Sequence, residues 1–220
     1  MASSKRKMNR RTAMTEVART AGAVCLGGFS LAALIESTSR ADARAIRPPG
    51  AQPEADFLSA CVRCGLCVQA CPYGTLSLAE WGQEAAVGTP YFTPREVPCY
   101  MCRDVPCARA CPTGALDRDI AIRDADMGVA VLVGHEDCLN YKGMNCSICV
   151  RVCPIRGDAI TLEPGEFNGR KIMIPTVHSR HCTGCGTCEK HCVTGHASIR
   201  VLPRDLGLGG HGRNRAGRET

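Results

Sequence analysis

The stretch from Cys61 to Pro72, CVRCGLCVQACP, constrains this chain more than any other. Its cysteines follow the pattern C-x2-C-x2-C-x3-C-P, which is the bacterial spacing for a [4Fe–4S] cluster. The close spacing lets one tight loop place three thiolates around the cubane, while the fourth cysteine ligates a second cluster. A run of this kind therefore predicts at least one more run in the same chain.

Three further cysteine motifs follow the first. The four motifs begin at Cys61, Cys99, Cys138 and Cys182, so that their starts are separated by 38, 39 and 44 residues. Such a period indicates an internal repeat, and the tail after each motif has a turn followed by a short alternating stretch typical of a strand. We expect a small, loop-rich α+β fold in which two bacterial-ferredoxin-like modules wrap around four [4Fe–4S] clusters.

Each motif supplies four cysteines, and together they account for all but one of the 17 in the chain. The first and fourth motifs share the unmodified spacing, and their members are Cys61, Cys64, Cys67, Cys71, and Cys182, Cys185, Cys188, Cys192. The second and third motifs carry insertions, and their members are Cys99, Cys102, Cys107, Cys111, and Cys138, Cys146, Cys149, Cys153. Four complete sets predict four clusters and no open iron position.

The pairing of the motifs decides to which cluster each fourth cysteine crosses. The shared spacing of motifs one and four favours a nested pairing, in which motif one pairs with four and two with three. Sequential pairing, one with two and three with four, is the alternative. In the nested pairing the ligand sets are Cys61, Cys64, Cys67 with Cys192; Cys182, Cys185, Cys188 with Cys71; Cys99, Cys102, Cys107 with Cys153; and Cys138, Cys146, Cys149 with Cys111.

Two other uses of cysteine compete with iron–sulfur chemistry. An even number of cysteines in an exported chain would ordinarily indicate disulfides, but neighbours in a C-x2-C-x2-C run are badly placed for eight separate bridges. Structural zinc sites join two C-x2-C pairs and do not need three closely spaced cysteines. Because only 4% of the residues are aromatic, large apolar side chains do not supply an ordinary core, and inorganic centres are expected to stabilise the fold.

Residues 1–43 are expected to be an export signal. A basic segment precedes an apolar run over residues 20–35, and ADA at residues 41–43 supplies an A-x-A cleavage site. The run is shorter than the roughly 20 residues of a transmembrane helix. The pair Arg10-Arg11 resembles a twin-arginine signal, whose route would carry the folded, cluster-loaded protein to the periplasm. An uncleaved anchor or an N-terminal amphipathic helix is the alternative.

The remaining chain is divided by its composition. Residues 44–56 form a Pro-rich lead-in, 57–205 the domain that carries the clusters, and 206–220 a flexible tail. The formal charge of +6 lies mostly in the leader, and the body has no basic stripe with interleaved aromatics, which excludes a nucleic-acid-binding surface. It also has no P-loop, nucleotide fingerprint or nucleophile elbow. We therefore expect an electron carrier with no catalytic residues of its own.

Several segments together resemble the MauM/NapG family of ferredoxin-type proteins. They are RPPGA at residues 47–51, ACVRCGLCVQACPYGTL at 60–76, GTPYF at 88–92 and PTVHSRHCTGCGTCEKHCV at 175–193. The resemblance covers nearly the whole chain and is greatest to the NapG branch. It implies a periplasmic electron-transfer protein with four [4Fe–4S] clusters, and the sixteen motif cysteines carry over one for one.

The resemblance also implies partners. These are a membrane-bound, quinol-oxidising ferredoxin-like protein of the NapH type, and the c-type cytochrome or nitrate reductase subunits to which electrons pass. Three alternative roles are a four-cluster subunit of another molybdenum oxidoreductase, a methylamine-utilisation ferredoxin and an assembly factor for the reductase. A separate export signal argues against the molybdenum-enzyme subunit, because such subunits usually travel on the signal of their catalytic partner.

Overall fold

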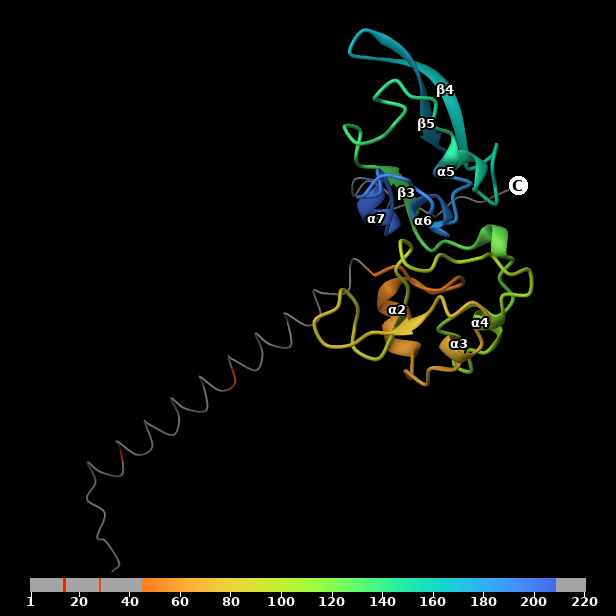
Figure 1. Cartoon of the computed structure of the whole chain (residues 1–220). Coiled ribbons are helices and arrows are strands. Elements are labelled where there is room, and N and C mark those ends of the chain that lie inside the picture. The colour runs from red at the N-terminus through yellow and green to blue at the C-terminus, as the bar shows by residue number, and fades with distance from the viewer. Residues whose placement is uncertain (1–13, 15–27, 29–44, 209–220) are drawn as a thin grey trace, which may run out of the picture. The chain divides into compact units, whose positions relative to one another are not determined.

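The computed structural model describes Met14, Gly28 and residues 45–208 (Figure 1). Apart from Met14 and Gly28, the predicted export signal lies outside the described residues, and so does the predicted tail from residue 209 on. The first residues assigned to that tail, 206 and 207, instead end a short helix. The chain divides into two units, residues 1–41 and 42–220, and every element below belongs to the second unit. The predicted loop-rich α+β fold is confirmed, and within the second unit we distinguish module one (residues 45–125) and module two (residues 126–208).

Module one has short elements separated by loops. Its helices and strands are, in chain order, α2 (Glu54–Ala60), α3 (Leu66–Gln69), β1 (Ser77–Leu78), β2 (Pro90–Tyr91), α4 (Pro106–Arg109) and the 3₁₀ helix η2 (Ile122–Asp124). Gly65 precedes α3 in the left-handed conformation, with φ of +74°, which glycine adopts without steric cost. Proline at the first position of α4 fits because the first turn of a helix needs no N–H donor there.

Module two contains the longer strands. Its elements are β3 (Val129–Leu132), α5 (Ile148–Arg151), β4 (Ile160–Phe167), β5 (Arg170–Val177), α6 (Thr187–Lys190), β6 (Ile199–Leu202) and α7 (Arg204–Gly207). Strands β4 and β5 pair over their full length as an antiparallel hairpin. Asn168 and Gly169 both have positive φ in its turn, as the Asn-Gly pair does in type I′ hairpins.

The two modules repeat one layout. In module two the strand before motif three, β3, pairs antiparallel with the strand after motif four, β6. In module one the equivalent pairing is a single bridge between Ala51 and Leu116. In each module a two-stranded hairpin follows the first of the two motifs, β1–β2 in one and β4–β5 in the other. This internal repeat is the architecture expected of two ferredoxin modules.

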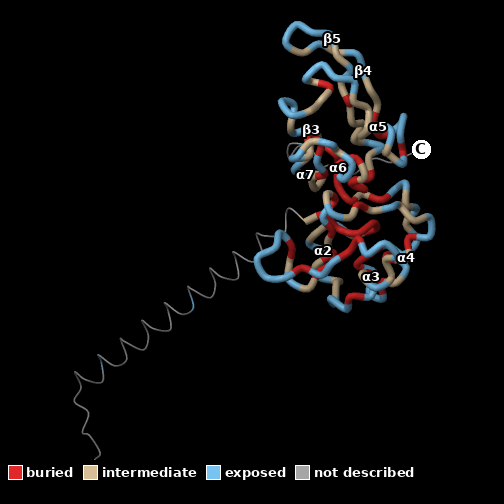
Figure 2. Tube along the Cα trace, in the orientation of Figure 1, coloured by how far each residue is buried: buried red, intermediate tan, exposed pale blue. Residues whose placement is uncertain are grey.

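The buried core includes cysteines of both modules, whereas the far half of the β4–β5 hairpin is mostly exposed (Figure 2). Phe57 and Leu116 are fully buried in module one, as are Val129 and Ile199 in module two. Several motif cysteines belong to the same buried cluster. Cysteine sulfur thus contributes much of the core that aromatic side chains would otherwise form.

The lead-in is more ordered than its composition predicts. Ile46 and Arg47 are buried, whereas the Pro-rich composition predicts an extended lead-in. The Arg47 guanidinium donates to the Thr89 hydroxyl at 2.8 Å and to the Pro90 carbonyl at 3.0 Å, and it also pairs with Glu54. The segment therefore belongs to module one.

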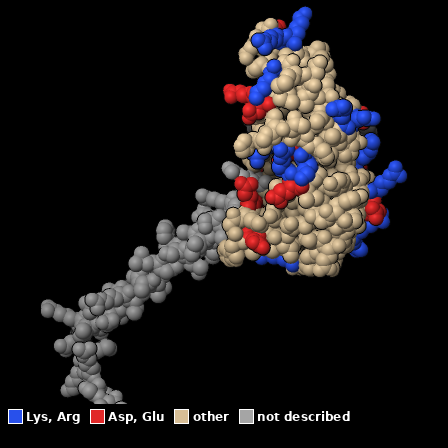
Figure 3. Space-filling model, viewed as in Figure 1, with Lys and Arg blue, Asp and Glu red and all other residues tan. Residues whose placement is uncertain are grey.

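The segment between β2 and motif two, residues 92–98, is called the arm, and it joins the two modules. Lys190 Nζ donates to the Glu96 carbonyl at 2.7 Å, and the Cys99 N–H donates to the Cys185 carbonyl at 2.8 Å. These bonds connect the start of motif two with motif four. Among the described residues, no helix has the length and hydropathy needed to span a membrane. On the face shown in Figure 3, basic and acidic side chains are interspersed and form no continuous basic stripe.

Candidate functional site

The sixteen described cysteines are all free of disulfide bonds and surround four small cavities. We name each site by the motif that supplies three of its cysteines. Site 1 contains Cys61, Cys64, Cys67 and Cys111; site 2 contains Cys99, Cys102, Cys107 and Cys71; site 3 contains Cys138, Cys146, Cys149 and Cys192; and site 4 contains Cys182, Cys185, Cys188 and Cys153.

The nested pairing is wrong in this structure. The fourth cysteines of motifs one and two cross to each other's cavities, as do those of motifs three and four. Cys71 therefore lies at site 2 and not with motif four, and Cys192 lies at site 3 and not with motif one. Likewise Cys111 lies at site 1 and Cys153 at site 4, each within its own module.

Strand and helix packing explain the sequential pairing. Pairing of β3 with β6 brings the flanks of motifs three and four together, and helix α5 of motif three packs against helix α6 of motif four. In module one α3 packs against α4 in the same way. The insertions in motifs two and three lengthen loops only, so shared spacing does not identify the partner motif. Each module instead combines one unmodified motif with one modified motif.

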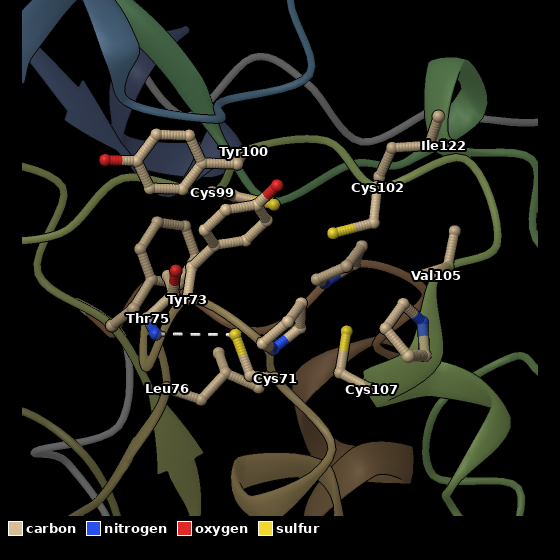
Figure 4. Close-up of a pocket in the computed structure, with 14 residues that line it drawn as sticks. Cys71, Tyr73, Thr75, Leu76, Cys99, Tyr100, Cys102, Val105, Cys107 and Ile122 are labelled. Carbon is tan, nitrogen blue, oxygen red and sulfur yellow. Dashed lines mark hydrogen bonds between the residues drawn. The ribbon is translucent and has the colours of Figure 1, made fainter.

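Site 2 shows how the side chains are arranged (Figure 4). The sulfurs of Cys71, Cys102 and Cys107 face a common central space. The rings of Tyr73 and Tyr100 lie together at one side of that space, with centroids 4.4 Å apart. The two rings are about half exposed, so they separate the cysteines from solvent on this side.

Hydrogen-bond donors lie beside the crossing cysteines. The Thr75 N–H donates to Cys71 Sγ at 3.4 Å, and the hydroxyl of Thr194 lies 3.1 Å from Cys192 Sγ. Although burial raises the pKa of both thiols, these bonds and further backbone donors outweigh it and lower the pKa overall. Cys153 has no threonine in the corresponding turn, and burial raises its pKa to about 11. Donors to sulfur stabilise the thiolate form, in which a metal is bound.

In motifs one, two and three the third cysteine has a raised pKa instead. Burial raises the pKa of Cys67 and Cys149 to about 11 and that of Cys107 to about 12, and neighbouring thiolates add to each rise. Four thiolates crowded into an apolar cavity need a cationic centre between them. Four thiolate donors per cavity fit a [4Fe–4S] core. Among the described residues no three Cys, His, Asp or Glu side chains converge on one point as ligands of a single metal ion.

The four sites form a series. Sites 1 and 2 are adjacent because motifs one and two exchange their fourth cysteines. Sites 2 and 4 meet at the hydrogen bond from Cys99 to the Cys185 carbonyl. Sites 4 and 3 are adjacent because motifs three and four exchange their fourth cysteines. The order is therefore 1–2–4–3, and the exposed Cys64 lies at the site 1 end.

Some residues at the sites were not predicted from the sequence. The threonines two positions after a fourth cysteine, Thr113 and Thr194, recur in CPT and CVT, and this recurrence was a signal in the sequence. Arg95 and Arg204 also contact the cysteine loops. No local pattern marks these two, because the contacts are made across 97 and 22 residues.

Comparison with known proteins agrees with this architecture. The family model described as "4Fe-4S dicluster domain" matches residues 60–115 and 142–196. The first match spans motifs one and two, and the second spans motif four and the last three cysteines of motif three. The chain is 79% identical over 217 residues to the methylamine utilization ferredoxin-type protein MauM of Paracoccus denitrificans, covering 98% of this chain and 97% of that protein. It is 70% identical over 211 residues to the MauM protein of Methylorubrum extorquens, covering 96% of each.

The ferredoxin-type protein NapG of Escherichia coli is 52% identical over 212 residues, covering 94% of this chain and 91% of NapG. The chain is therefore nearer to these two MauM proteins than to this NapG, contrary to the predicted branch. The family prediction itself is confirmed. The matches extend over both modules, and the relatives in both branches are named ferredoxin-type proteins. The function common to the two branches is iron–sulfur electron transfer. The chain belongs to the MauM/NapG family of ferredoxin-type proteins.

Proposed function

We propose that the chain holds four [4Fe–4S] clusters, one at each of sites 1 to 4, and conducts electrons along the series 1–2–4–3. The observation that carries this proposal is the arrangement of sixteen free cysteines as four sets of four around four cavities. When bound, a [4Fe–4S] cluster accepts and releases one electron at a potential set by its protein surroundings. The protein's part is to ligate the iron, to exclude water and to donate hydrogen bonds to sulfur.

The ligand assignment is tested by replacing one crossing cysteine. Cys71→Ala removes a ligand of site 2 in the sequential pairing and of the motif-four site in the nested one. We expect the variant to lose about four of about sixteen iron atoms. Its electron paramagnetic resonance spectrum and set of midpoint potentials should match those of Cys102→Ala and differ from those of Cys185→Ala. A match to Cys185→Ala would overturn the assignment, and far fewer than about sixteen irons in the parent protein would overturn the four-cluster proposal.

We further propose that the protein works in the periplasm in methylamine utilisation. The leader, with Arg10-Arg11 and the ADA sequence at residues 41–43, supports export of the folded protein. The identity of 79% to a protein named for methylamine utilization supports the pathway. A membrane-bound redox protein and a c-type cytochrome are the partners we propose, because the resemblance to the MauM/NapG family implies them.

Electron transfer towards nitrate reductase, with a quinol-oxidising partner of the NapH type, is the second candidate. It is favoured by the 52% identity to NapG over almost the whole chain. Deletion of the gene should abolish growth on methylamine as nitrogen source and leave periplasmic nitrate reduction unchanged. The opposite phenotype would support the second candidate. Tight binding of the purified protein to an immature partner enzyme, without reoxidation of its reduced clusters by a cytochrome, would support a role in assembly.

A further inference from the structure

Two arginines donate to the backbone carbonyls of cysteines. Arg204 Nη2 donates to the Cys182 carbonyl and Arg95 Nη1 to the Cys192 carbonyl, each at 2.8 Å. Within residues 45–208 these are the two hydrogen bonds from an arginine side chain to a cysteine. Cys182 belongs to site 4 and Cys192 to site 3, so both contacts fall on module two. The buried Arg47 of module one donates to non-cysteine groups.

Arg204 is held firmly beside site 4. It begins helix α7, and its guanidinium also donates to the Ser179 carbonyl at 2.7 Å and to the Gly128 carbonyl at 3.3 Å. Its ion pair with Asp126 has an Nε–Oδ1 distance of 2.7 Å, and each side chain is only about one-fifth exposed. Burial raises the pKa of the Cys182 thiol, and the Arg204 charge opposes that rise. The Arg204 guanidinium is therefore only partly solvated, and water screens its charge from Cys182 only in part.

Arg95 reaches module two from the arm of module one. Its guanidinium donates to the carbonyls of Glu189 at 2.6 Å, Cys192 at 2.8 Å and Thr194 at 3.0 Å. These groups lie at the C-terminal end of α6 and in the turn after it. Cations are favoured at that end of a helix, because its carbonyls carry partial negative charge. The same turn holds the crossing cysteine of site 3.

Reduction adds one negative charge to a cluster. A fixed cation nearby stabilises the reduced form and raises its potential, since charge, hydrogen bonding and exposure set the potential of such sites. We propose that Arg95 raises the reduction potential of site 3 and that Arg204 raises the reduction potential of site 4. This inference rests on the proposed function. Each reduction transfers one electron from the reductant to the cluster at that site, and no covalent bond is formed or broken.

Potentiometric titration of the full, cluster-loaded chain with dithionite, followed by electron paramagnetic resonance, tests the proposal. We expect Arg204→Gln to lower one midpoint potential and Arg95→Gln to lower another, each corresponding to about a tenfold weaker reduction equilibrium, or ~59 mV for a one-electron couple. Arg204→Lys retains the charge and should restore most of the loss. Asp126→Asn removes the anion that offsets Arg204 and should raise the potential that Arg204→Gln lowers. Arg118→Gln, at an exposed residue, is the matched control.

The possible results separate failure of this inference from failure of the four-cluster proposal. Unchanged potentials in both glutamine variants with full iron content would overturn the inference and leave the four-cluster proposal intact. A shift assigned to site 1 or 2, by comparison with Cys64→Ala and Cys102→Ala, would also overturn it. If Arg204→Gln loses iron, Arg204→Lys and Asp126→Asn still decide the role of the charge, because both keep a donor or the arginine in place. A parent protein without four clusters would refute the proposed function itself.

Discussion

Gly50→Ala tests whether the segment before α2 is part of module one. Gly50 has φ of +80°, and an added Cβ would lie 2.9 Å from the Asp117 carbonyl oxygen and 3.1 Å from Ile120 Cγ2. The Gly50 carbonyl also accepts a hydrogen bond from the Asp117 N–H at 2.7 Å. Alanine therefore strains the backbone and pushes apart the two segments that open and close the module.

The cost can be estimated from these contacts. The left-handed conformation costs a residue with a Cβ about 1–2 kcal/mol, and loss of the Asp117 bond adds about 0.5–1.5 kcal/mol. Gly82→Ala is a matched control, because Gly82 has φ of +86° but no atom within 4 Å of an added Cβ. It should cost only the backbone strain. The difference between the two variants is about 0.5–1.5 kcal/mol, or roughly 2- to 13-fold in an opening equilibrium.

Hydrogen exchange of the cluster-loaded protein measures this difference. The amides of Gln52 and Asp117 donate across the Gly50 junction and should exchange faster in Gly50→Ala than in Gly82→Ala by that factor. The amides of β3 in module two should keep their protection in both variants, since local opening reports local stability. Equal exchange at Gln52 in the two variants would refute the assignment of the segment to the packed module.

Three further changes have defined outcomes. Asn140→Ala removes a buried amide that donates to the Met173 carbonyl and accepts from the Cys146 N–H, both at 2.7 Å. Thermal unfolding should show that the free energy of unfolding falls by about 2–4 kcal/mol. Asn140→Asp keeps the acceptor oxygen and should lower the free energy of unfolding by less. Thr194→Val removes the hydroxyl 3.1 Å from a site 3 sulfur and should lower one midpoint potential only, whereas a shift of all four would contradict a local effect. Iron removal by a chelator should unfold both modules, as seen by loss of far-UV circular dichroism, because metal binding supplies folding free energy; retained amide protection in β6 would contradict this.

The sequence predicts that three cysteines of each motif lie at the same site. When only two residues separate neighbouring cysteines, the loop can adopt few conformations, and most of them bring the thiols together. The destination of the fourth cysteine is not predictable from spacing. It depends on which motifs are brought together by strand pairing, as by β3 with β6, and on helix contacts such as α5 with α6. These contacts join residues far apart in the chain, and the insertion in motif three hides the resemblance between partner motifs.

The packing of the lead-in is not predictable from the sequence for a different reason. Proline and glycine at residues 48–50 indicate irregular backbone, and the backbone there is irregular. Composition does not reveal that Ile46 packs into the core or that Arg47 is buried against Thr89. Burial of an arginine depends on acceptors from distant segments, and no local pattern encodes them.

Asymmetry between the modules follows from the same long-range contacts. The repeat supplies four similar cysteine sets, and a chain with four equal sites would have no preferred direction for an electron. The arm after β2 breaks this equivalence, because Arg95 donates to the turn of Cys192. Helix α7 breaks it again, because Arg204 donates to Cys182. Both elements lie outside the cysteine motifs, so the repeated motifs hold the clusters while the segments between and after them differentiate the two modules.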